Sequence, residues 1–440
     1  MKAVVGYKGK SVLRKSVVIA LVVMAFLLLV WNLAMAPQTR LEQFDVDAQI
    51  TDAMLVPKLQ PDARPFLMGF TYQPYDWNDE AFDKTFSYLR KHGDLITLFH
   101  DVGIPWDEAL SKSPLPKSLE QELRRQQRGA ADFDNVVVML SVLGSDRVSL
   151  TQSIGETGSV PRSGDWADRT FDDNEVVTAY LNHARHLIER FKPKYFSYVA
   201  EIDAVFNDPN DHRFQQLLTF SRTVYETLKV EYPQLVVFAE FNLNDDAYMA
   251  ERQDIIDAML PYTDLYAVST YADHNDAVGG DATKLPADWF TRVKFIAPSK
   301  PFAILESGFI ASPFMHPTIG VPIAGRQDRL LIPGGPKSQA LFTVKMLDAA
   351  HELEAEFINL WAVRDLDLLF DRFAANSEFN HPMLRTAQDR GLYDETGNPR
   401  PALEVWEYWR RLPLETQFGV KVEVTVLGQC EGCLLGAPRS

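Results

Sequence analysis

Two glutamates stand directly after apolar, strand-like runs. Residues Tyr195–Ala200 lead into Glu201, and the run "PFAIL" leads into Glu306. Because burying an unpaired charge is costly, an acid at the mouth of a core strand needs a physical reason to be there. Two such carboxyls can share one reaction, in which one donates a proton and the other attacks as a nucleophile. That chemistry requires both acids at the same edge of one sheet.

Eight apolar runs alternate with helical patterns, and this alternation predicts how the acids are positioned. We expect strands at Phe66–Tyr72, Leu95–His100, Val136–Leu143, Tyr195–Glu201, Leu235–Phe241, Leu265–Tyr271, Phe302–Glu306 and Phe357–Val363. Helical periodicity is clearest in residues 78–93, 172–193, 213–233 and 337–354. Interleaved strands and helices predict an α/β fold with a parallel sheet and right-handed crossovers. Eight units over residues 62–412 favour a single (β/α)8 TIM barrel.

A doubly wound open sheet is the alternative fold. Such a sheet usually has a Gly-rich phosphate loop after its first strand, whereas this chain has the aromatic "GFTYQPYDW" at that point. The barrel is therefore the preferred prediction.

In a TIM barrel, the C-terminal ends of the strands form the active site. Glu201 would end the fourth strand and Glu306 the seventh, so the two carboxylates would face each other across the barrel mouth. This placement suits retaining glycoside hydrolysis, with one acid on each face of the sugar. The other strand ends supply polar and aromatic groups that we expect to bind substrate: Tyr72, His100, Asp101, Asn242, Tyr271 and Trp361.

Several of these residues have structural alternatives. Glu240 can pair with a lysine or arginine at the rim, and Asp203 in "EID" can accept a structural hydrogen bond in place of Glu201. His100 can form a hydrogen bond with the next loop, and Trp361 can pack at the rim of the barrel without binding sugar. We expect Glu201 to keep a proton at neutral pH and Glu306 to stay ionised.

The order of these elements resembles the clan of retaining (β/α)8 glycoside hydrolases. Within it, "FKPKYFSYVAEID" is similar to the fourth-strand region of the arabinogalactan endo-β-1,4-galactanase group, and "GLYDETGNPRPALEVWEYW" is similar to the segment that opens the last helix. The resemblance implies that Glu201 is the acid/base, Glu306 the nucleophile and Tyr271 a hydroxyl that positions Glu306. It also implies that Trp361 is a sugar platform.

One position departs from the clan. An Asn usually precedes the acid/base, but here that position is Ala200. In the clan this Asn contacts the sugar 2-hydroxyl. Three interpretations stay open: another group such as Asn242 fills that role, the substrate lacks that hydroxyl pattern, or catalysis is lost. The sequence therefore supports two functions, a membrane-tethered glycosidase acting on a cell-envelope or environmental polysaccharide, or a decayed barrel that binds carbohydrate or assists exopolysaccharide assembly.

The N-terminus carries a membrane signal. Five basic residues precede the apolar stretch Val17–Ala36, which is near the roughly 20 residues needed to span the hydrocarbon core. The "AMA" before Pro37 resembles a signal-peptidase site, but the length and the proline favour an uncleaved anchor. We expect residues 1–40 to form a basic end and anchor, with the body outside the cytoplasm. Cleavage would give a secreted protein instead.

The rest of the chain sets further limits. The net charge is −16, and residues 1–40 carry six basic residues and no acid, which leaves −22 for the remainder. An acidic body is a poor match for nucleic acid.

We expect no metal site and no cofactor, since the nine histidines are scattered. Residues 41–61 are predicted to be a linker, and residues 413–440 a strand and a tail containing Cys430 and Cys433, whose redox state stays open.

Overall fold

A computed structural model describes residues 45–317, 329–374 and 385–415 of the chain. The expected anchor, Val17–Ala36, and the two cysteines, Cys430 and Cys433, lie outside these residues. Within the described part, none of the helices combines the length and the apolar character needed to cross a membrane.

The parallel sheet closes on itself. Its order is β7-β6-β3-β2-β1-β13-β10-β9-β8. The two end strands, β7 (Val236–Phe238) and β8 (Glu240–Asn242), are separated only by Ala239, so they form one interrupted barrel strand. β7 pairs with β6 on one side and β8 with β9 on the other, which joins the two edges of the sheet. The remaining strands are β1 (Leu67–Thr71), β2 (Leu95–His100), β3 (Asn135–Leu140), β6 (Tyr195–Ser197), β9 (Tyr266–Thr270), β10 (Phe302–Ser307) and β13 (Phe357–Leu360). The predicted TIM barrel is confirmed.

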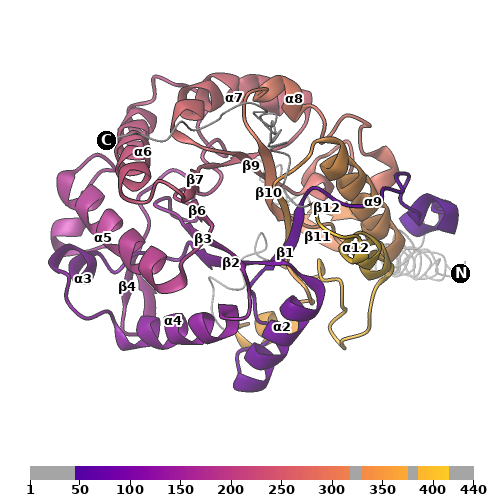
Figure 1. Cartoon of the computed structure of the whole chain (residues 1–440), viewed down its shortest axis with the longest axis horizontal. Helices are drawn as coiled ribbons and strands as arrows, with labels where there is room; N and C mark the ends of the chain where they lie inside the picture. The colour runs from indigo at the N-terminus through magenta and orange to yellow at the C-terminus, as the bar shows by residue number, and fades with distance from the viewer. Residues whose placement is uncertain (1–44, 318–328, 375–384, 416–440) are drawn as a thin grey trace, which may run out of the picture.

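Helices surround the barrel in the order of the chain (Figure 1). They are α2 (Asp79–His92), α3 (Trp106–Ser111), α4 (Lys117–Ala130), α5 (Asn174–Phe191), α6 (His212–Glu231), α7 (Asp246–Met259), α8 (Val293–Ile296), α9 (Pro336–Glu352), α10 (Asp367–Arg372) and α12 (Pro401–Arg411). After β9 the crossover is irregular, because α8 has only four residues. Two short hairpins, β4–β5 (Ser153–Gly155 and Gly158–Val160) and β11–β12 (Phe314–Pro317 and Arg329–Ile332), branch from the loops after β3 and β10.

Local sequence explains where the helices begin and end. In α2, the Asn78 side chain accepts a 2.9 Å hydrogen bond from the N–H of Ala81, and the helix ends at Gly93. Two acids lie in its first turn and three basic residues in its last, which complements the helix dipole. α9 and α12 each begin with a proline, whose missing N–H costs nothing at the first helical turn.

Alternate residues on each strand face the barrel interior or the helices. The interior is filled by one cluster of buried side chains that includes Leu95, Met139 and Phe357. Asn359 also points inward, where its amide donates to Thr71 Oγ1 at 2.9 Å and to the Leu305 carbonyl at 2.8 Å. A much larger cluster fills the space between strands and helices. The alternation decides which strand-end residues can reach the barrel mouth.

A β-bulge interrupts this alternation in β10. Ile304 pairs with Val268, but Glu306, two residues later, pairs with the next residue of β9, Ser269. Ile304 and Val268 both belong to the cluster that faces the helices, so simple alternation would turn Glu306 toward the helices as well. A bulge supplies the extra residue that re-aims the side chain. Glu306 is thereby directed to the interior.

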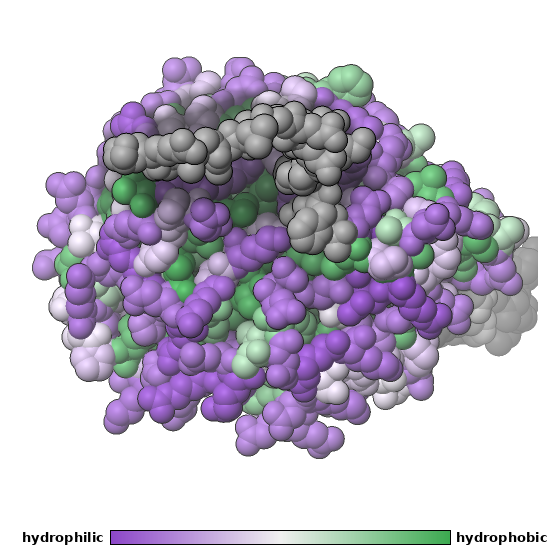
Figure 2. All heavy atoms as spheres, in the orientation of Figure 1, coloured by the Kyte–Doolittle hydropathy of each residue, from purple (hydrophilic) through white to green (hydrophobic). Residues whose placement is uncertain are grey.

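The segments flanking the barrel pack against it. The Asp47 carboxylate accepts hydrogen bonds from the N–H groups of Lys337 and Ser338 at 3.0 and 2.9 Å, and so caps the first turn of α9. Near the other end of the chain, Leu414 forms a parallel bridge with Arg64 beside β1. The face drawn in Figure 2 is largely hydrophilic, with hydrophobic side chains in small patches.

Candidate active site

Glu306 lies at the end of β10 and is almost fully buried, with 7% exposure. The Tyr271 hydroxyl donates a 2.8 Å hydrogen bond to Glu306 Oε2. Arg390 lies over the Tyr271 ring, 4.6 Å from its centroid, and is itself fixed by a buried ion pair with Asp273 at 2.9 Å. The loops after β9 and β13 therefore hold the carboxyl of Glu306 through a chain of contacts.

Glu201 follows β6 and meets an arginine that the sequence did not single out. Arg147 Nε donates a 2.8 Å hydrogen bond to Glu201 Oε2, and its Nη1 lies 3.8 Å from Asp101 Oδ2. Both Arg147 and Glu201 have left-handed backbone conformations, with φ of 56° and 45°. Such conformations in non-glycine residues carry strain and often mark functional sites. No spacing signal in the sequence linked residue 147 to residue 201.

A third glutamate lies deeper in the barrel. Glu240 in β8 has no exposed surface, and neither of its carboxyl oxygens has a hydrogen-bond partner among the described residues. Burial, then the charges of Glu306 and Glu201, raise the pKa of Glu240 well above its usual value. The rim ion pair considered for Glu240 is therefore wrong, because its strand position turns the side chain inward, away from the rim.

The proton distribution differs from the expectation. Burial, followed by the charge of Glu201, raises the pKa of Glu306 to about 8. The hydrogen bond from Tyr271 and the charge of Arg147 lower the same pKa but do not offset the first two effects. Glu306 is consequently protonated at neutral pH in the free protein, while Glu201 is held in an ion pair. This direction is opposite to the one that the expectation of an ionised Glu306 needs.

The fully buried Asp203 and the half-buried Asn242 form a separate pair beside the acids. Asp203 Oδ1 accepts hydrogen bonds from the Asn242 backbone N–H at 2.8 Å and side-chain amide at 3.0 Å. Asp203 thus has the structural role considered for it. Asn242 lies on the interior side of β8, but its amide nitrogen is engaged by Asp203. Ala200 packs within the interior cluster and contributes no polar side chain there.

Trp361 follows β13 on the interior side. Its ring packs edge-on against Phe99 at 5.7 Å between centroids, and its indole N–H has no hydrogen-bond partner among the described residues. The N–H itself is buried, so the partly exposed ring is the surface on which a sugar could stack. Asp101, Glu201, Glu306, Tyr271 and Trp361 therefore all lie on the interior side of the strand ends.

Tyr72 and His100 lie on the other side of their strands. Tyr72 stacks on Phe86 of α2 at 4.3 Å between ring centroids, and His100 packs near Phe191 of α5. Burial lowers the pKa of His100 to about 4, so its ring is neutral. The prediction that these two residues bind substrate must be corrected, because strand alternation directs them to the helix layer.

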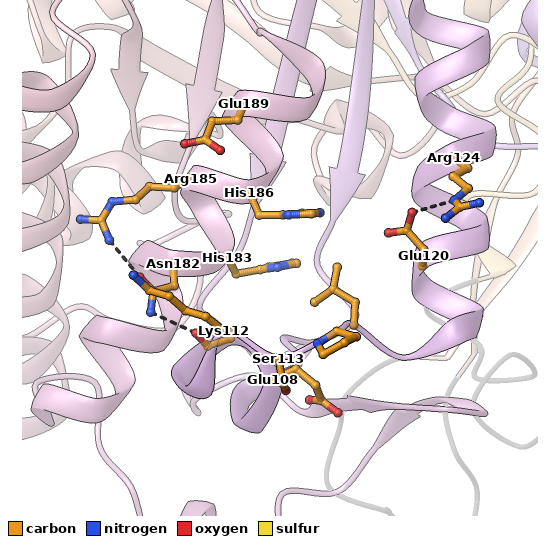
Figure 3. A pocket seen from close by; sticks show the side chains of 13 residues that line it. Glu108, Lys112, Ser113, Glu120, Arg124, Asn182, His183, Arg185, His186 and Glu189 are labelled. Carbon is orange, nitrogen blue, oxygen red and sulfur yellow. Dashed lines mark hydrogen bonds and ion pairs between the residues drawn. The ribbon is translucent and has the colours of Figure 1, made fainter.

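A pocket of about 550 Å³ lies outside the barrel, among α3, α4 and α5. Figure 3 shows the His183 and His186 rings lying parallel on α5, with Glu120 on α4 across from them. Glu120 is neutralised by Arg124 and Arg190 at 2.7 Å each. This pocket is separate from the glutamates at the strand ends, and two of its charged lining residues, Glu120 and Arg124, pair with each other.

Three acids at the last loop lie close enough to one another to hold a metal ion. The ligand atoms of Asp365, Asp367 and Asp389 lie within 4.8 Å of one another. Asp365, however, already accepts a 2.6 Å hydrogen bond from Arg400 and a 2.8 Å hydrogen bond from the N–H of Gly391. We therefore interpret this group as the polar anchor of the segment that leads into α12.

Comparisons with known proteins extend the description of the fold. No protein-family model matches the chain, and no curated protein matches it either. Similar solved structures include a GH5_18 protein from Bifidobacterium longum subsp. longum in complex with Manβ1-4GlcNAc, with a TM-score of 0.51, 13% identity and 80% of each chain covered. Native xylanase 10B from Thermotoga maritima has a TM-score of 0.50 and 12% identity over 79% of this chain and 95% of its own.

A third structure is the GH53 catalytic domain from Ignisphaera aggregans, with a TM-score of 0.48 and 16% identity over 82% of this chain and 98% of that one. At identities this low, what is shared is the barrel fold. The similarity to the GH5_18 protein and to xylanase 10B, with TM-scores of 0.51 and 0.50, therefore shows the barrel fold alone.

Proposed function

We propose that this protein is a membrane-tethered retaining glycoside hydrolase that acts on a cell-envelope or environmental polysaccharide. The observation that supports it best is the pair Glu201 and Glu306, two carboxyls on the interior side of one barrel mouth whose charges influence each other. A hydroxyl, Tyr271, holds the second of them at 2.8 Å. The similar barrel of solved glycoside hydrolases is consistent with this proposal.

The proposed roles follow retaining chemistry. Glu201 gives its proton to the glycosidic oxygen while a carboxylate oxygen of Glu306 attacks the anomeric carbon, so the bond to the leaving sugar breaks as a glycosyl–enzyme bond forms. Water then attacks the same carbon, Glu201 takes its proton, and Glu306 leaves as the carboxylate. Tyr271 orients Glu306 for both steps, and Trp361 stacks on the sugar ring.

The test is hydrolysis of a panel of polysaccharides by the full-length protein in mild detergent. Glu306→Gln should abolish turnover on every substrate, because no nucleophile remains. Glu201→Gln should lose polysaccharide hydrolysis but cleave activated aryl glycosides, whose leaving group needs no proton. Unchanged turnover in both variants contradicts the proposal.

A carbohydrate-binding or exopolysaccharide-assembly protein on a decayed barrel is the second candidate. Two observations favour it: Ala200 stands where the clan has Asn, and Arg147 engages Glu201 as an ion pair. This function predicts that the wild-type protein binds members of the panel without cleaving any. Binding isotherms measured beside the hydrolysis assays separate the two functions.

Tethering is the remaining part of the proposal. We attribute it to the apolar stretch Val17–Ala36 with its basic flank, which places the barrel outside the cytoplasm. Mass analysis of the native N-terminus tests it. A chain that begins at Pro37 or later shows cleavage and secretion instead.

A further inference from the structure

The pocket among α3, α4 and α5 has a polar side chain at its base that the protein leaves unsatisfied. The pocket holds about 550 Å³, within the range of about 300–1,000 Å³ that is usual for small-molecule sites. His183 of α5 lines it and is only 2% exposed, and its Nδ1 has no hydrogen-bond partner among the described residues. Buried polar atoms without a partner are uncommon in proteins, so this one needs a physical explanation.

The ring of His183 is directed into the pocket. Figure 3 shows the rings of His183 and His186 pointing from α5 toward Glu120 on α4, nearly parallel to each other at 6.4 Å between centroids. His186 is exposed at the edge of the pocket, whereas His183 is buried at its base. A ligand that enters past His186 therefore meets the ring of His183.

His183 is a neutral ring that can act as donor or acceptor. Burial, followed by the charges of His100 and His186, lowers the pKa of His183 to about 3. A neutral imidazole has one nitrogen that donates and one that accepts. Because Nδ1 has no partner in the described part of the chain, no hydrogen bond there fixes which nitrogen carries the proton. A hydroxyl group, which also donates and accepts, matches a ring of this kind.

The charges around the pocket favour a neutral ligand. Three acids and three bases line it, so the lining has no net charge. Arg124 and Arg185 already pair with Glu120 and Glu231 at 2.7 Å each. The other charged lining residues form no ion pair within the described ranges, and they are of both signs: Glu108, Glu189 and Lys112. An ionic ligand would be repelled by one sign or the other, whereas hydroxyl groups can bond to both.

One wall of the pocket is apolar. Ala109 of α3 lines it together with Pro114 and Leu115, which lie in the connection between α3 and α4. A ligand that covers this wall removes apolar surface from water, which is favourable. The pocket therefore suits a compact neutral molecule with several hydroxyl groups and one apolar face. A pyranose ring has its hydroxyl groups around the edge and C–H groups on its faces.

We propose that this pocket is a second saccharide-binding site, outside the barrel mouth, which takes a neutral mono- or disaccharide unit. The choice of a saccharide among neutral, hydroxyl-rich ligands rests on the function proposed above. The His183 ring bonds a sugar hydroxyl at the base, and the apolar face of the sugar packs on Pro114 and Leu115. Such a site holds a polysaccharide against the barrel without any contact to Glu201 or Glu306.

The test is an NMR titration of full-length Glu306→Gln protein, which cannot turn substrate over, with ¹³C-labelled histidine and in mild detergent. The probes are three neutral disaccharides: lactose, cellobiose and N,N′-diacetylchitobiose. The ring signals of the two histidines are assigned by their loss in His183→Phe and His186→Phe. Added up to about 20 mM, enough to detect a Kd near 1 mM, at least one probe should shift both signals in a saturable way.

His183→Phe keeps a flat ring but removes both nitrogens. Read from the His186 signal, the affinity should fall about fivefold or more, as for the loss of one hydrogen bond. His351→Phe is the matched control, because His351 Nδ1 is also buried without a partner in the described structure but its ring lies beside Trp409, 5.5 Å between centroids. If His183→Phe does not fold by circular dichroism, Pro114→Asp places a charge on the exposed end of the apolar wall and should weaken binding as much.

Two results overturn the inference: none of the three disaccharides shifts the two histidine signals, or the affinity is unchanged in the pocket variant. Tighter binding of glucosamine or glucuronate than of the neutral probes overturns the assignment of a neutral ligand. The titration needs no turnover, so the two proposals can fail separately. A protein that binds at His183 but cleaves no polysaccharide disproves the glycosidase function alone, and one that cleaves without these shifts disproves the second site alone.

Discussion

The Tyr271 hydroxyl lies 2.8 Å from Glu306 Oε2 and is the hydrogen-bond donor that the structure gives to this carboxyl. Tyr271 follows β9 and Glu306 ends β10, so two neighbouring strands place them together. Arg390 lies over the Tyr271 ring and limits its movement. The hydrogen bond lowers the pKa of Glu306 against the stronger effects of burial and of Glu201. Several measurable consequences depend on this balance.

Replacing Tyr271 with Phe should raise the pKa of Glu306 above its present value of about 8. Loss of one hydrogen bond to a charged group costs roughly 1.5–3 kcal/mol, so kcat/KM should fall about 10- to 100-fold. The limb of the kcat/KM profile against pH that reports the ionisation of Glu306 should also move to higher pH. Tyr72→Phe is the control, because the Tyr72 hydroxyl has no hydrogen-bond partner in the described structure. An unmoved limb in Tyr271→Phe contradicts the assigned contact.

Replacing Glu306 with Gln should change the pH dependence of stability. The folded-state pKa of Glu306 is about 8, against 4.5 for the ordinary group. Its contribution to stability is complete below pH 4.5 and is lost as pH rises through 8, because the unfolded chain releases the proton first. Gln cannot ionise, so the free energy of unfolding of the variant should equal that of the wild type at pH 4.5. At pH 8 it should be higher than that of the wild type by about a few kcal/mol. Thermal unfolding of both proteins across this range is the measurement, and a pH-independent difference in Tm rules out a buried, protonated Glu306.

Replacing His100 should affect acid stability and leave sugar binding alone. Burial lowers the pKa of His100 to about 4 from 6.5, so its contribution is present above pH 6.5 and is lost as pH falls through 4. His100→Leu should reduce this acid sensitivity while KM stays within about twofold, as for a site with no ligand contact. Measurements of KM and Tm for both proteins at several pH values test whether His100 affects acid stability alone. A large rise in KM places His100 in the sugar site after all.

Replacing Trp361 should separate stacking from hydrogen bonding. Its indole N–H is unpaired in the described structure and its ring packs edge-on against Phe99. Trp361→Phe keeps an aromatic face and should lose little binding, whereas Trp361→Ala should raise KM or Kd about tenfold, the equivalent of roughly 1.4 kcal/mol. Isothermal titration with oligosaccharides and Glu306→Gln as the parent protein measures this without turnover. Equal affinities in all three proteins assign Trp361 to rim packing.

Much of the fold could be predicted from the sequence because it depends on local periodicity. The strand expected at Leu95–His100 has the same bounds in the structure, and the helix expected over residues 78–93 is α2 with its predicted Gly93 end. The irregular crossover with the four-residue α8 was not predictable, because no strong amphipathic pattern marks it. Arg147 was missed for a similar reason: it lies on a loop, and only the closed barrel brings it to Glu201.

The sequence by itself determined that acids follow strands four and seven of a parallel barrel, since apolar runs and helix signals are properties of short segments. The alternation of side chains along a strand, which turns Tyr72 and His100 toward the helices, is also a property of the sequence. The prediction of substrate-binding residues considered only which residues end the strands and did not apply this alternation. Tertiary structure decided which side Glu306 faces: the register shift between Ile304 and Glu306 against β9 turns it inward, and a register belongs to two strands together. It also decided the location of the proton, because burial and the charges of residues distant in sequence set the pKa of Glu306.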